Sequence, residues 1–218
     1  MSQNKKVFLV DDHPLVREGL ANLIHQQPDL EVCGEAAGEP QALQMIGTLQ
    51  PDIAVVDLSL EDGSGLELMK SIKAMHPAVA MLALSMHDES LYAERALRAG
   101  ARGYLMKREA AKKVIQGIRA VLAGQVFVSD KIAALMAERF VEGRTAAASP
   151  VAQLSDRELE VFQLLGRGQS TRQIADHLHV GFKTVQAYCA RIKDKLQLAN
   201  ATELLRAAMQ WNAGQPEK

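Results

Sequence analysis

The chain has 218 residues, enough for two small domains, and its hydrophobic share of 48% excludes a protein that is disordered throughout. No apolar run approaches the roughly 18 residues of a membrane-spanning helix, and Met1–Lys6 lacks a signal-peptide pattern, so we expect a cytoplasmic protein without membrane contact. The net charge of −1 is unevenly distributed, since residues 151–218 are slightly basic and residues 1–150 are slightly acidic. Cys33 and Cys189 form neither a disulfide framework nor a metal-binding spacing, which predicts free thiols in a reducing compartment.

Strand and helix patterns alternate five times over residues 6–122. Short apolar runs predict strands at residues 6–10, 30–35, 51–57, 79–84 and 103–106. Amphipathic segments predict helices at residues 14–24, 39–47, 63–75, 89–98 and 110–122. Such alternation predicts an α/β fold, with a parallel sheet covered by helices on both faces. We expect the flavodoxin-like strand order 2-1-3-4-5.

The rest of the chain has no regular strand pattern. Residues 126–141 predict a strand-like turn and a helix, and the small, polar, proline-terminated segment 143–150 predicts a linker. Helical patterns follow at residues 155–166, 171–178, 182–197 and 201–211. We therefore expect an α/β domain over residues 1–123, a helix and flexible linker over residues 124–150, and a small all-α domain over residues 151–218.

Polar groups stand at the carboxyl ends of four predicted strands. Asp11 and Asp12 follow the first strand, Asp57 ends the third, Ser85 follows the fourth and Lys107 follows the fifth. Because the carboxyl ends of parallel strands meet at one edge of a sheet, we expect these groups to converge. Neighbouring carboxylates repel unless a cation compensates them, and oxygen ligands suit Mg²⁺. Asp57 can then act as a carboxylate nucleophile toward phosphorus, with Lys107 and Ser85 contacting the transferred oxygens.

Each of these residues also has an ordinary structural explanation. Asp11 and Asp12 can cap the helix that begins at Pro14, and Ser85 can cap the helix that follows it. Lys107 can be a solvated loop lysine, and Asp57 alone can simply open a loop. The placement of all five residues at strand ends favours phosphoryl chemistry over these explanations.

Residues 5–123 resemble the receiver domain of two-component response regulators. The matching segments are Val10-Asp11-Asp12-His13, Asp52 through Asp57, Leu84-Ser85-Met86-His87 and Gly103-Tyr104-Leu105-Met106-Lys107. The resemblance implies that a histidine kinase phosphorylates Asp57, that Ser85 and Lys107 contact the phosphate, and that Tyr104 changes rotamer with Ser85. The divalent-cation ligands that it implies are Asp11, Asp12, Asp57 and the backbone carbonyl of Ser59. Many receivers have proline after the lysine, whereas this chain has Arg108, which leaves the presentation of Lys107 open.

Two helical segments joined by a turn at Gly181 predict a helix-turn-helix. Ser155 and Glu158 predict a capping box on the helix before it. The second helix of the motif has an apolar face and a polar-basic face, and the latter would enter the major groove. The residues predicted to contact DNA are Lys183, Thr184, Gln186, Ala187, Ala190, Arg191 and Lys195. Gln186 suits adenine, the two alanines suit close approach or a thymine methyl, and the cations suit phosphates. The competing explanation is a solvated amphipathic helix.

Residues 154–212 resemble the LuxR-type domain, and the whole chain resembles a NarL/FixJ-type response regulator. The matching segments are Leu154-Ser155-Asp156-Arg157-Glu158, Gln173-Ile174-Ala175, Lys183-Thr184-Val185 and Ile192-Lys193-Asp194-Lys195-Leu196. Tyr188 occupies a position that is usually histidine, and Ala190 one that is commonly basic. In this family the last helix, residues 201–211 here, commonly pairs two copies on DNA, although such a helix can also simply close a core.

We therefore expect a transcription factor whose phosphorylation at Asp57 controls sequence-specific binding to double-stranded DNA. The added charge would bias a surface near the fourth helix and fifth strand of the receiver. A homodimer is expected when the protein is active or bound to DNA. The alternative is a phosphorylation-controlled protein-interaction switch whose helical domain does not bind DNA. We do not expect an enzyme, because no catalytic constellation lies outside the receiver.

Overall fold

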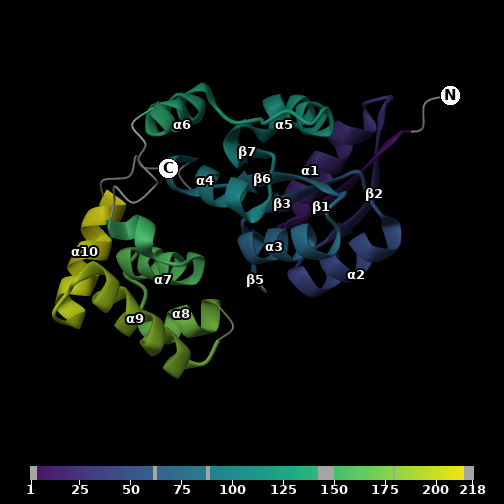
Figure 1. Cartoon of the computed structure of the whole chain (residues 1–218). Coiled ribbons are helices and arrows are strands. Elements are labelled where there is room, and N and C mark those ends of the chain that lie inside the picture. The colour runs from purple at the N-terminus through teal and green to yellow at the C-terminus, as the bar shows by residue number, and fades with distance from the viewer. Residues whose placement is uncertain (1–3, 61–62, 87–88, 142–149, 179, 214–218) are drawn as a thin grey trace. The chain divides into compact units, whose positions relative to one another are not determined.

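The chain folds into two compact units, Met1–Leu135 and Met136–Lys218. The computed structural model, shown in Figure 1, describes residues 4–60, 63–86, 89–141, 150–178 and 180–213. Most of the predicted linker, residues 143–149, lies outside these described residues. Within the described part of the chain, none of the helices is long and apolar enough to cross a membrane.

The first unit is a five-stranded parallel sheet with helices on both faces (Figure 1). Its strands are β1 (Lys5–Val10), β2 (Leu30–Ala36), β3 (Ile53–Asp57), β6 (Ala80–Ser85) and β7 (Gly103–Met106). Its helices are α1 (Pro14–His25), α2 (Glu39–Leu49), α3 (Gly65–Met75), α4 (Glu89–Ala99) and α5 (Lys107–Leu122). The sheet order is β2-β1-β3-β6-β7, which confirms the predicted order 2-1-3-4-5 when the strands of this sheet are counted along the chain.

The two faces of the sheet are covered by different helices. Helices α1 and α5 pack together over one face, and α2, α3 and α4 pack side by side over the other. All five residues of the central strand β3 are buried, as expected for a parallel strand covered on both faces. The strand therefore delivers Asp57 to an edge of the sheet that is already shielded from water.

The ends of several elements differ from the predictions. Helix α5 begins at Lys107, three residues before the predicted start, because Lys107, Arg108 and Glu109 contain no proline or glycine to delay it. A small antiparallel hairpin, β4 (Ser59–Leu60) with β5 (Gly63–Ser64), follows Asp57 and was not predicted, since two-residue strands are too short to show periodicity. After α5, Phe127 pairs with Gly103 at the edge of the sheet, and α6 (Asp130–Val141) follows.

Across residues 150–178 and 180–213, the second unit contains helices and no strand. It contains a 3-10 helix η1 (Pro150–Gln153) and helices α7 (Asp156–Gly166), α8 (Thr171–His177), α9 (Phe182–Leu196) and α10 (Ala201–Ala213). The predicted capping box of Ser155 and Glu158 is present, and Ser170 forms a second one with Gln173. Gly166 permits close packing of α7 on α10, because a Cβ there would overlap the Ala208 carbonyl.

Gly65 provides a test of how tightly the sheet edge is built. A Cβ at this position would overlap the Asp57 carbonyl oxygen and approach the Leu58 Cα to 2.7 Å. We expect Gly65→Ala to lower the free energy of unfolding of the first unit by about 2 kcal/mol, because backbone atoms must move. Gly19→Ala is the control, since nothing lies within 4 Å of its Cβ in the middle of α1, and it should stabilise by about 0.5–1 kcal/mol. Chemical denaturation followed by circular dichroism measures both, and equal stability of Gly65→Ala and wild type would contradict the packing described here.

Candidate functional site

The register of the parallel sheet brings together the polar residues that the sequence predicts around Asp57. Strand β1 pairs Val10 with Val56, so Asp11 follows β1 just where Asp57 ends β3. Asp57 pairs in turn with Leu84, and Ser85 pairs with Met106. Lys107 comes directly after β7, so all of these groups occupy one edge of the sheet.

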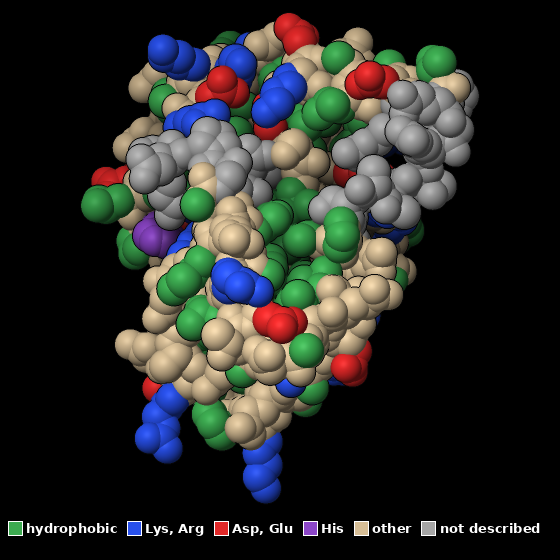
Figure 2. Space-filling model, turned by 90° about the vertical axis from the view of Figure 1, so that its left-hand side faces the viewer, with side chains coloured by type: hydrophobic (Ala, Val, Ile, Leu, Met, Phe, Trp, Pro, Cys, Tyr) green, Lys and Arg blue, Asp and Glu red, His purple; other side chains and the backbone are tan. Residues whose placement is uncertain are grey.

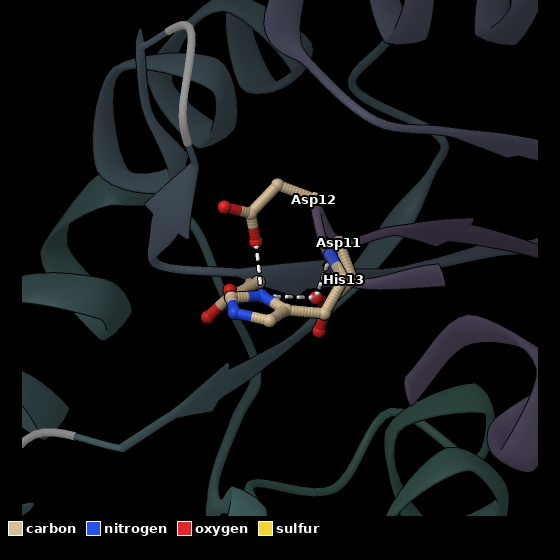
Figure 3. A group of neighbouring side chains, drawn as sticks. Asp11, Asp12 and His13 are labelled. Atoms are coloured by element: carbon tan, nitrogen blue, oxygen red, sulfur yellow. Dashed lines mark hydrogen bonds and ion pairs between the residues drawn. The ribbon is translucent and has the colours of Figure 1, made fainter. Parts of the chain in front are cut away.

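The acidic residues form a cluster with one histidine. Ligand atoms of Asp11, Asp12, His13 and Asp57 all lie within 4.8 Å of one another. Figure 3 shows the Asp12 and His13 side chains turned toward each other beside Asp11, at the end of β1. Asp11 and Asp57 are buried, with exposed fractions of 2% and 1%. His13 was not among the predicted site residues, although its position directly after the acid pair was the available signal.

Lys107 is the cation that holds this cluster together. Its ammonium Nζ lies 2.7 Å from Asp11 Oδ2 and 2.7 Å from Asp57 Oδ2. Backbone groups also contribute, since the Ser59 N–H donates to Asp57 Oδ1 at 3.2 Å and the His13 N–H donates to Asp11 Oδ1 at 2.9 Å. Asp11 Oδ2 is buried and meets Lys107 as an ion pair without hydrogen-bond alignment.

These charges do not balance. One ammonium faces three carboxylates, those of Asp11, Asp12 and Asp57, which leaves two negative charges if all are ionised. A divalent cation would neutralise this excess, and the oxygen atoms of three carboxylates suit Mg²⁺. The residues present therefore fit a divalent cation.

The protonation of Asp57 reflects the same imbalance. Burial raises the pKa of Asp57 to about 7, and the charge of Asp11 acts in the same direction, while Lys107 and the Ser59 N–H oppose it. Burial also acts on Lys107 by lowering its pKa, but the Asp57 and Asp11 carboxylates outweigh this and raise it overall. Lys107 is therefore charged, and full ionisation of Asp57 at neutral pH calls for additional positive charge.

The other predicted residues of the first unit are in place around this cluster. Ser85 is fully buried at the end of β6, and Tyr104 is buried within β7. The Ser59 backbone contacts Asp57 through its N–H, and the use of its carbonyl as a metal ligand stays a prediction. Arg17 was missed: it donates to the Asp11 carbonyl and lies 3.4 Å from Glu35, which ties the loop after β1 to α1 and β2.

The second unit contains the predicted helix-turn-helix, with α8 and α9 joined by a short turn and Gly181 as the N-cap of α9. All of the residues predicted to contact DNA are exposed on α9. Val185 and Ile192 are buried on the opposite face, whereas Tyr188, Cys189 and Leu196 are only half-buried. Lys and Arg side chains project at the bottom of the view in Figure 2, at the height where Figure 1 draws α8 and α9 of this unit.

Two of the predicted DNA-contacting cations already have a partner inside the unit. Lys195 Nζ lies 2.6 Å from the Glu158 carboxylate, and Arg191 Nε lies 3.8 Å from it. The guanidinium carbon of Arg191 also stands 4.9 Å from the centre of the Tyr188 ring, a cation–π distance. Burial acts to raise the pKa of Glu158, but hydrogen bonds from Lys195 and Ser155 outweigh it and lower the pKa. The sequence analysis identified Glu158 as a capping residue and did not predict that its carboxylate pairs with Lys195 and lies near Arg191 on α9.

The raised pKa of Asp57 predicts an unusual dependence of stability on pH in metal-free protein. The unfolded state loses this proton near pH 4 and the folded state near pH 7, so stability falls as pH rises between these values. Asp57→Asn removes this loss. Its stability relative to wild type should therefore increase by about 3 kcal/mol from about pH 4.5 to about pH 8 in EDTA, measured by urea denaturation.

Asp52, at the other end of β3, is the control with the opposite sign. Burial acts to raise its pKa, but its hydrogen bonds with Lys5 and the Lys6 N–H outweigh burial and lower it. Asp52→Asn should therefore lose stability relative to wild type as pH rises from about 2 to about 5, and the difference should stay constant above that range. A parallel pH dependence for the two variants would contradict the assigned environments.

Comparison with known proteins assigns the family. A family model for the response regulator receiver domain matches residues 7–119, and one for the luxR family of bacterial regulatory proteins matches residues 152–208. The oxygen regulatory protein NreC of Staphylococcus carnosus is 34% identical over 209 residues, covering 94% of this chain and 96% of the relative. The transcriptional activator DevR/DosR of Mycobacterium tuberculosis is 32% identical over 211 residues, covering 97% of each.

Solved structures agree with this assignment. A two-component response regulator of the LuxR family from an Aurantimonas species is 38% identical over 64% of this chain and 99% of its own, with a TM-score of 0.59. RcsB of Salmonella enterica serovar Typhimurium, bound to a promoter in the presence of the phosphomimetic BeF3−, covers 95% of this chain and 100% of its own. At 24% identity and a TM-score of 0.66, RcsB supports the fold alone. With both families matched in chain order and relatives aligned over nearly their whole length, the chain belongs to the NarL/FixJ-type two-component response regulators, which join a receiver domain to a LuxR-type helix-turn-helix.

Proposed function

We propose that a histidine kinase phosphorylates Asp57 and that this modification controls binding of the second unit to specific sites on double-stranded DNA, and thereby transcription. The observation that carries the proposal is the buried Asp57 carboxylate at a strand end, 2.7 Å from the Lys107 ammonium. A second supporting observation is the exposed polar-basic face of α9 in a helix-turn-helix. In this scheme residues 1–123 form the receiver domain that is phosphorylated, residues 124–150 form a helix and linker between the two domains, and residues 151–218 bind DNA.

In the transfer step an Asp57 carboxylate oxygen attacks the phosphorus atom. A new P–O bond forms as the bond from phosphorus to the donor nitrogen of the kinase histidine breaks, and the imidazole leaves with the electron pair. Asp11, Asp12, Asp57 and the Ser59 carbonyl would hold the divalent cation. When bound, that cation neutralises the carboxylates and the incoming phosphoryl oxygens. Lys107, already in contact with Asp57, provides a second positive charge to the same oxygens.

Phosphorylation would change the charge of the protein at one buried side chain, that of Asp57. A phosphoryl group adds roughly −1.5 to −2 charges, which would draw Lys107 and the Ser85 hydroxyl toward it. Ser85 pairs with Met106 across β6 and β7, so this movement reaches the strand that carries Tyr104. Repacking near α4 and β7 would then govern self-association, and a dimer would present two copies of α9 to DNA.

On DNA, α9 would enter the major groove. Gln186, Ala187 and Ala190 lie exposed on this helix and are the candidates for base contacts. Lys183, Thr184 and Arg191 are exposed candidates for phosphate contacts. Lys195 is the weakest candidate in the predicted set, because its ammonium is paired with Glu158 at 2.6 Å.

Incorporation of phosphate tests the acceptor. Incubation of the full chain with acetyl phosphate and Mg²⁺ should label wild type with a phosphoryl group that hydroxylamine removes, as it does from an acyl phosphate. Asp57→Asn should not be labelled, because an amide is not a carboxylate nucleophile. Asp130→Asn, which removes an exposed carboxylate from α6, is the control and should be labelled like wild type. A hydroxylamine-sensitive label on Asp57→Asn would overturn the assignment.

Salt dependence tests the DNA-binding face. A genomic-fragment binding experiment, with and without phosphodonor, would first supply a site. On that site, Lys183→Ala with Arg191→Ala should weaken binding and reduce the slope of log affinity against log salt by about two per bound protomer. Lys70→Ala with Lys73→Ala removes the same charge from the exposed surface of α3 and should leave the slope unchanged. An unaltered slope in the α9 variant would favour a helical unit that binds a protein partner.

A further inference from the structure

The His13 side chain lies at the acidic cluster, and capping of α1 does not explain its position. It is the N-cap residue of α1, yet its side chain makes no capping hydrogen bond. The ring Nδ1 instead lies 2.6 Å from Asp12 Oδ1 and 3.4 Å from Asp11 Oδ1. Figure 3 shows the ring beside the Asp11 and Asp12 carboxylates, with a dashed line joining it to Asp12.

The backbone holds His13 beside the cluster. The His13 N–H donates to Asp11 Oδ1, and Pro14 restricts the chain immediately after it. The ring is therefore brought to the cluster by two constraints that do not involve the ring itself. Its donor atom lies within 4.8 Å of ligand atoms from Asp11, Asp12 and Asp57, a separation that suits ligands of one ion.

We propose that His13 is a nitrogen ligand of the divalent cation at this site and shifts its preference from Mg²⁺ toward Mn²⁺ and Co²⁺. The inference rests on the metal site of the proposed function and adds a ligand to it. Mg²⁺ favours oxygen ligands, whereas imidazole binds the transition-metal ions more strongly. A site that combines carboxylates with one imidazole therefore discriminates among cations differently from a site with oxygen ligands alone.

Charge balance is consistent with a neutral fourth side-chain ligand in addition to the three carboxylates. Three carboxylates and the Lys107 ammonium leave two negative charges, which a divalent cation neutralises. A neutral imidazole adds a donor atom without disturbing this balance, whereas a fourth carboxylate would leave an uncompensated charge in a partly buried site.

The exposure of the cluster also places His13 on its open side. Asp11 and Asp57 are buried and Lys107 is 10% exposed, whereas the Asp12 and His13 side chains are 17% and 65% exposed. An ion that enters from solvent therefore meets Asp12 and His13 before the buried carboxylates. His13 can then join the ion without displacing Lys107 from the buried side.

Pulsed electron paramagnetic resonance of bound Mn²⁺ tests the inference directly, because a coordinated imidazole gives a nitrogen coupling. Wild type should show this coupling and His13→Gln should lose it. The ratio of Mn²⁺ to Mg²⁺ affinity, from competition titration, should fall roughly tenfold in the same variant. Glutamine retains a hydrogen-bonding group for Asp12, so a purely hydrogen-bonding role of His13 would leave the affinity ratio unchanged.

His25→Gln, an exposed histidine in the last turn of the same helix, is the matched control and should retain both signals. Binding of Mn²⁺ that Asp12→Asn abolishes, without nitrogen coupling in wild type, would overturn the role of His13 and leave the metal site intact. Mn²⁺ binding that Asp12→Asn does not affect would instead overturn the metal site itself.

Discussion

The buried ion pair of Lys107 with Asp11 and Asp57 is the constraint on which the receiver unit depends. Two carboxylates at the ends of adjacent strands are both nearly inaccessible to water, and without a cation they would repel across the sheet edge. One ammonium satisfies part of this requirement and leaves the rest to an ion from solution. The edge of the sheet therefore carries an excess of negative charge, and this excess favours binding of a cation.

The order of the strands determines where this negative charge lies. β3 is central and buried along its whole length, so its last residue reaches a protected edge, while Asp11 and Lys107 follow strands on either side of it. Gly65 allows α3 to begin directly against the Asp57 backbone carbonyl, where a Cβ would overlap it. The Asp57 carboxylate is therefore positioned by backbone packing as well as by its charged partners.

Much of this arrangement could be predicted from the sequence, because its signals are local and periodic. Apolar runs located the strands, and the polar residues after them identified the edge where Asp11, Asp57, Ser85 and Lys107 meet. Contacts between individual side chains could not be predicted in the same way. Nothing in the spacing of Lys195 indicated that its ammonium pairs with Glu158, some 37 residues earlier in the chain. His13 was likewise visible only as a neighbour of two acids, since the direction of its ring depends on the turn before Pro14.

The position of Glu158 has a consequence for how α9 responds to DNA. This one carboxylate caps α7, pairs with Lys195 and lies near Arg191, so it serves as an internal substitute for a phosphate. In the proposed complex, a DNA phosphate that recruits Arg191 would compete with the Glu158 carboxylate, which α7 carries and the Lys195 ammonium on α9 already pairs with. In that complex α9 would approach DNA with part of its positive charge already paired inside the protein, and its affinity would reflect the exchange of the Glu158 carboxylate for a DNA phosphate.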